Sequence, residues 1–133
     1  MSERAKGTFE VEFSPHPPYD SAPGATLGQI SIAKQFHGEL EATSHVEMLS
    51  ARTEIPNSAG YVAIERVQGS LLGREGSFVL QHNGSMNRGA ESLSVVVVPD
   101  SGTGALKGLT GRMSIERAGG EHAYVFEFDF DRN

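Results

Sequence analysis

Apolar and polar residues alternate along most of this chain, which is the pattern of β-strands that bury one face. The clearest alternations lie near the two ends, over residues 7–13 and 122–130, and both carry aromatic residues on one face. Between them, residues 27–54, 60–84 and 93–117 each indicate two strands joined by a turn that contains glycine. No stretch has a convincing helical period. The pattern therefore predicts one strand, three hairpins and one strand, or eight strands in all.

A short glycine pattern recurs at the expected turns. It is G-x-L-x-G-x-x-G, clear in residues 69–76 and 104–111 and degenerate from residue 38. A recurring interval of this kind indicates a repeated supersecondary unit, whose turn needs glycine for positive φ. Pairing the first copy like the second puts Leu40 opposite His45, Gly38 opposite Glu47, and Phe36 opposite Leu49.

Eight antiparallel strands whose first and last members can pair favour closure into a barrel. Closure also removes the exposed strand edges that promote aggregation. A two-sheet sandwich is the alternative. The length of 133 residues suits one domain with one core, so we expect a single barrel domain over residues 1–133.

The central hairpin contains the most informative pair of side chains. With a turn centred on Gly73 and Arg74, Glu65 faces His82, and Val67 faces Leu80 on the same side of the sheet. A carboxylate orients an imidazole and poises it as a general base, so we predict that Glu65 and His82 are catalytic. The alternative is a buried structural pair that fixes the strand register.

Further residues fall on the same predicted inward face. Lys34, His45, Glu47 and Tyr61 add polar groups there, and we expect Glu47 and Tyr61 to lie nearer one mouth of the barrel. We predict that the ligand-binding residues are Glu47, Tyr61, Phe36, Phe78 and Leu80.

Composition excludes several classes of function. The formal net charge is −6, which argues against nucleic acid or an anionic membrane as a partner. The chain has no cysteine, and its histidines lack metal-ligand spacing, so we expect no metal and no cofactor. No apolar run approaches the length of a membrane span, and the N-terminal residues have no apolar core of a signal peptide. We therefore expect a soluble cytoplasmic protein.

Four segments carry a resemblance to a known family. They are residues 34–44, 60–67, 76–84 and 97–104, for example GSFVLQHNG and VVPDSGTG, and together they resemble the bacterial "domain of unknown function 3224" family. The resemblance implies a barrel similar to that of allene oxide cyclase, which closes a fatty-acid epoxide to a cyclopentenone. It implies the fold and not that activity, because fold alone does not transfer function.

Two classes of function remain. The first is a barrel that binds a small amphipathic molecule in its lumen and acts as an isomerase or cyclase. The second is a non-catalytic module that acts through its surface or by oligomerisation. A lumen of ~300 Å³ or more supports the first class, and a filled lumen supports the second. We also expect a homo-oligomer, because Val62, Ile64, Val79, Val96 and Val98 fall on the outward face.

Overall fold

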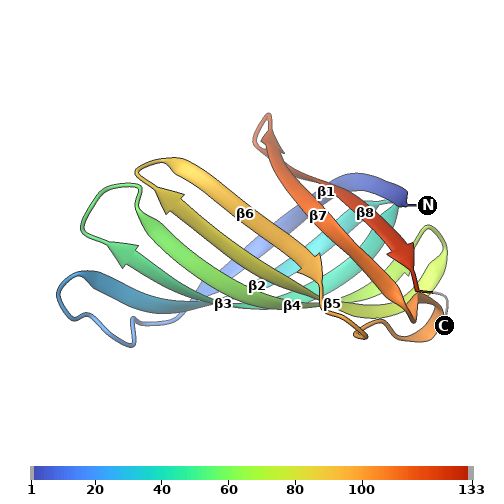
Figure 1. Ribbon diagram of the computed structural model, residues 1–133, viewed down its shortest axis with the longest axis horizontal. Coiled ribbons are helices and arrows are strands. Elements are labelled where there is room, and N and C mark those ends of the chain that lie inside the picture. Colours follow the sequence, from blue (N-terminus) through green and yellow to red (C-terminus); the bar gives the residue numbers. More distant parts are fainter. Residues whose placement is uncertain (1, 132–133) are drawn as a thin grey trace.

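The chain folds into a closed barrel of eight antiparallel strands, seen in a computed structural model that describes residues 2–131. The strands pair in sequence order, and β1 closes the ring by pairing with β8 (Figure 1). The strands are β1 (Glu3–Pro15), β2 (Ala25–Gly38), β3 (Leu40–Thr53), β4 (Ala59–Leu71), β5 (Arg74–Asn87), β6 (Ala90–Val97), β7 (Leu109–Ala118) and β8 (Glu121–Phe130). One short 3₁₀ helix, η1 (Gly104–Leu106), lies between β6 and β7. The predicted all-β class, strand number and closure are confirmed.

Side chains pack the lumen at one end, where β1 begins and β8 ends, on the right in Figure 1. The core there is built by the inward residues of the alternating strands, as the sequence predicts. Phe78 stacks on Phe126, whose ring lies 5.4 Å from that of Phe128. Leu106 of η1 is also fully buried against this cluster, so the loop after β6 closes this end of the barrel.

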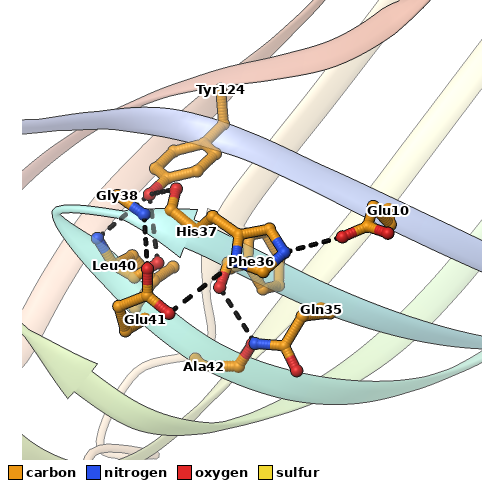
Figure 2. A network of polar contacts seen from close by, with 9 residues as sticks. All are labelled: Glu10, Gln35, Phe36, His37, Gly38, Leu40, Glu41, Ala42 and Tyr124. Carbon is orange, nitrogen blue, oxygen red and sulfur yellow. Dashed lines mark hydrogen bonds and ion pairs between the residues drawn. The ribbon is translucent and has the colours of Figure 1, made fainter.

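A tyrosine hydroxyl ties the last strand to the turn between β2 and β3 (Figure 2). The backbone N–H of Leu40 donates to the hydroxyl of Tyr124 over 3.0 Å. The hydroxyl hydrogen in turn faces the carbonyl oxygens of His37 and Leu40, at 3.0 and 3.1 Å. Tyr124 is almost wholly buried, so these bonds satisfy backbone groups that water does not reach.

The register of the central hairpin differs from the prediction by two residues. The turn is Leu72–Gly73, with φ of 48° and 84°, so Leu71 faces Arg74 and Glu65 faces Leu80. A two-residue hairpin turn with positive φ at both central positions matches the twist of the strands, which explains why the chain turns here. Because the shift is even, Glu65 and His82 stay on one face, as diagonal neighbours.

In the β2–β3 hairpin the observed facing residues differ from the predicted ones by an odd number of positions. The predicted register of this hairpin was therefore wrong. Phe36 faces Ala42 and Ser31 faces Glu47, because the chain turns at Gly38, where φ is 111°, and not after Leu40. The partner of Phe36 is thus Ala42 instead of Leu49, seven positions earlier (49 − 42), and an odd shift of the facing residues places the other set of β3 side chains inside. His45, Glu47 and Leu49 consequently lie on the outer face.

The third predicted hairpin, β6–β7, is barely paired. Within residues 2–131, Val96 and Arg112 are the single pair of facing residues between these strands, and every other neighbouring pair of strands forms a longer ladder. The two strands diverge from that point towards the top of Figure 1. The barrel is therefore closed, but this seam (the β6–β7 seam) is weak.

Candidate functional site

A cavity of about 380 Å³ occupies the half of the lumen that the core leaves empty. It lies towards the connections β1–β2, β3–β4 and β5–β6, at the left of Figure 1. Its walls are mainly apolar and include Val11, Ile32 and Met48. Phe13 and Leu93 are about half exposed at its rim, so the cavity opens to solvent there.

The floor of the cavity carries a buried ionic cluster centred on Glu65, which is fully buried on β4. Oxygen Oε1 of Glu65 accepts a hydrogen bond from His82 Nε2 at 2.7 Å and contacts Lys34 Nζ at 3.2 Å. Oxygen Oε2 accepts from the Ser44 hydroxyl at 2.6 Å. Four strands, β2 to β5, each contribute one of these side chains. Both oxygens of Glu65 therefore have the hydrogen-bond and ionic partners that a buried carboxylate requires.

The electrostatics of the cluster fix the ionisation of Glu65. Burial raises the pKa of Glu65, but the hydrogen bond from His82 and the charge of Lys34 outweigh burial and lower it. Glu65 is therefore a carboxylate at neutral pH. An ionised carboxylate only accepts hydrogen bonds, so His82 Nε2 must carry the proton that it shares with Glu65.

The remaining imidazole nitrogen of His82 faces the cavity. Within residues 2–131, His82 Nδ1 forms no hydrogen bond, whereas every fully buried side-chain nitrogen or oxygen has a partner. Nδ1 is therefore not fully buried, and the cavity that His82 lines is where it is accessible. His82 and Lys34 line the cavity, whereas Glu65 and Ser44 lie behind them. The floor thus offers one basic nitrogen and one ammonium group to a bound molecule.

Aromatic rings shape the mouth of the cavity. Tyr61 packs closely on Gly84, where an added Cβ would come within 2.4 Å of its ring. His122 stacks on Phe9 with ring centres 4.9 Å apart, and the Nε of Arg117 donates to His122 Nε2 at 3.3 Å. Burial and the nearby charges of Arg117 and Lys34 lower the pKa of His122, which is therefore neutral at neutral pH.

The structure brings together three of the predicted site residues. Glu65 and His82 share one face and a hydrogen bond, and Tyr61 stands nearer the mouth. Phe36, Phe78 and Leu80 belong to the packed core and do not line the cavity. Glu65 itself does not line the cavity; it holds His82 and Lys34, which do.

Glu47 does not belong to this site, because β3 turns it outwards. It accepts hydrogen bonds from Ser31 and Gln29 and bonds to His45 on the outer surface. The hydrogen bonds from Gln29, Ser31 and His45 lower its pKa. The prediction that Glu47 and His45 lie inside the barrel was wrong.

Ser44 was missed, and an available signal points to it. Leu40, Ala42, Val46 and Met48 share its parity along β3 and are apolar, whereas the intervening positions are polar apart from Leu49. This alternation places Ser44 inside and contradicts the register taken from the glycine repeat. His122 belongs to the predicted last strand, residues 122–130, but was not linked to the site.

Two further observations concern the part of the chain that the structure describes. No three of its histidine, aspartate and glutamate side chains are arranged to hold a metal ion. None of its helical turns has the length and apolar character needed to cross a bilayer.

The comparisons with known proteins identify the family. The model of the family described as "Protein of unknown function (DUF3224)" matches residues 5–128. The chain belongs to the DUF3224 family. A crystal structure of a DUF3224 protein of unknown function from Shewanella oneidensis MR-1 is similar to it, with 47% sequence identity and a TM-score of 0.94. The match covers 99% of this chain and 100% of the other. The comparison with curated proteins gives no match.

Proposed function

We propose that this DUF3224 protein binds a small amphipathic molecule in the open half of its lumen. The observation that carries the proposal is a largely apolar cavity of about 380 Å³ with two polar groups, from His82 and Lys34, at its floor. Binding sites for small molecules combine apolar walls with a few fixed polar groups in this way. The volume also exceeds the ~300 Å³ that separates a binding lumen from a filled one.

The polar floor is fixed before a ligand arrives. Glu65 holds both His82 and Lys34 by one oxygen, and the Lys34 ammonium lies 4.8 Å from the centre of the Phe9 ring. Groups held in this way lose little conformational freedom on binding, so more of the interaction energy contributes to affinity. The apolar body of the ligand would then lie against Val11, Ile32 and Met48.

A thermal-stabilisation screen of compact amphipathic molecules tests the proposal. A ligand present at 100 times its Kd stabilises the native state by about 2.7 kcal/mol and raises the Tm. His82→Gln nearly preserves volume and should abolish most of this stabilisation. His45→Gln, the same change on the outer face, should leave it intact. If His82→Gln costs ~3 kcal/mol or more of folding stability but leaves ligand stabilisation unchanged, the cluster is structural and the proposal fails.

Proton transfer at carbon is the second candidate function, favoured by the orientation of His82. Its Nε2–H is held by Glu65, which leaves the lone pair of Nδ1 directed to the cavity as a general base. In an isomerisation, Nδ1 would take a proton from a carbon next to a ligand carbonyl, and the imidazolium would return it to another carbon. The Lys34 ammonium would stabilise the enolate oxygen formed between the two steps.

Deuterium exchange of a simple ketone tests this activity without knowledge of the natural substrate. The protein should speed the exchange of the α-hydrogens of 2-tetralone in D₂O, followed by NMR. We expect His82→Gln to lower the rate of exchange by a factor of about 100 or more, which is the usual contribution of a general base. His45→Gln should retain it. Equal rates for wild type and His82→Gln would exclude His82 as the base.

A further inference from the structure

The charges around the cavity differ from those of the chain as a whole. The chain has 17 acidic and 11 basic residues, yet within residues 2–131 the cavity is lined by Lys34 and Arg52 and by no aspartate or glutamate. The lining of a site favours a ligand of complementary charge. Taking the proposed function as its basis, we propose that the lumen ligand is an organic anion, an apolar body whose carboxylate or equivalent oxyanion points to Lys34.

Lys34 is suited to this role by its burial. Its side chain is 7% exposed, and its ammonium lies 4.8 and 5.8 Å from the ring centres of Phe9 and Phe36. An ammonium has three N–H donors, and within residues 2–131 Glu65 is the one ion-pair partner of Lys34. The other donors are free for a ligand oxygen. In a cavity from which the ligand displaces water, such a charge-assisted bond is stronger than at the surface.

Glu65 does not repel such an anion as an exposed carboxylate would. Its charge is balanced by Lys34, and its two oxygens are occupied by His82, Lys34 and Ser44. The anion adds one negative charge to this neutral pair. The N–H donors of Lys34 that Glu65 does not use can meet this charge at the floor.

The anionic group belongs at the floor and not at the mouth. Arg52 at the mouth is exposed, where water and salt screen its charge. Burial and the negative charge of Glu91 raise the pKa of Tyr61, so the mouth also has an acidic neighbour. The floor, in contrast, combines the buried ammonium with the imidazole.

Three probe molecules that share a decyl-length alkyl chain but differ in head group test the charge preference. They are decanoate, decanol and decyltrimethylammonium, each titrated calorimetrically into the wild-type protein. Decanoate should bind at least about tenfold tighter than decanol, a difference of about 1.4 kcal/mol, because a charge-assisted hydrogen bond is roughly twice as strong as a neutral one. The cation should bind weakest.

Two variants locate the anionic group. Lys34→Met combined with Glu65→Gln removes the ammonium and its counter-charge together and should bind decanoate no better than decanol. Arg52→Gln should keep the wild-type preference. Loss of the preference in Arg52→Gln alone would overturn the inference, and so would equal binding of decanol and decanoate by the wild type.

The titrations also separate the charge inference from the proposed function. If decanol binds and decanoate does not, only the charge inference fails; if no probe binds, the proposed function fails too. Should the double variant not fold, the three wild-type titrations still decide whether the lumen prefers an anionic head group.

Discussion

Replacing Glu65 by glutamine should destabilise the fold strongly, although the two side chains have nearly the same shape. The amide oxygen can still accept from His82 and Lys34, and the Ser44 hydroxyl can rotate to accept from the new NH₂ group. The hydrogen bonds can therefore survive. What is lost is the negative charge that compensates the Lys34 ammonium, whose side chain is only 7% exposed.

The expected loss follows from that uncompensated charge. Removing one partner of a buried ion pair costs about 3–5 kcal/mol, and because the hydrogen bonds can be retained we expect about 3 kcal/mol. Adding Lys34→Met to Glu65→Gln removes the second charge and should recover more than half of the loss, giving a favourable coupling energy. The chain has no tryptophan, so urea unfolding followed by far-UV circular dichroism is the suitable assay.

Acid should reduce the difference between wild type and Glu65→Gln. The pKa of Glu65 is lowered in the folded protein. Its ionised form therefore stabilises the fold above the unfolded pKa of about 4.3, and this contribution is lost as the pH falls through the folded pKa. Glu12→Gln, at an exposed position of β1, should change stability little at any pH. The reasoning is refuted if Glu65→Gln costs under about 1 kcal/mol at pH 7, or if the double variant is less stable than Glu65→Gln.

Three other predictions follow from packing. Tyr124→Phe leaves the buried N–H of Leu40 without its partner and should cost about 1–3 kcal/mol in urea unfolding; an unchanged midpoint would contradict the role of the hydroxyl. Gly76→Ala brings a Cβ within 2.1 Å of a backbone oxygen and should lower the Tm by several degrees, whereas Gly60→Ala meets nothing closer than 3.8 Å and should not. We also propose a homo-oligomer that buries Val62 and Ile64, each 52% exposed. Val62→Lys should then shift light scattering towards the monomer, and a monomeric wild type at high concentration would exclude the association.

The alternation of residues was enough to predict the barrel, because each strand buries one face against a shared core. It also placed Glu65, His82 and Lys34 inside, since on their own strands they share the parity of Val67, Phe78 and Phe36. The position of the β2–β3 turn could not be obtained from the glycine repeat. That turn is set by Gly38 and by the bonds that Tyr124 makes to Leu40 and His37. Such a contact between residues distant in sequence leaves no local pattern.

The division of the lumen was equally hidden from the sequence. Phe78 and Leu80 share a face with His82, and nothing in their spacing tells that two of the three lie in a filled end. The loop that carries Leu106 into the barrel decides this. Its glycines indicated a turn, but not that the turn would close one end of the lumen.

The weak β6–β7 seam is the place where this barrel can open most easily, because few backbone hydrogen bonds join the two strands there. In the part of the chain that the structure describes, widening the ring at that seam breaks the pairing of Val96 with Arg112 alone, while the longer ladders elsewhere stay intact. Leu93 and Ile115, on the two sides of the seam, both line the cavity. The width of the cavity can therefore adjust to a bound molecule with the loss of few backbone hydrogen bonds. We expect the free amides of β6 and β7 to exchange with deuterium sooner than those of β3 and β4, and a molecule held in the lumen to slow them.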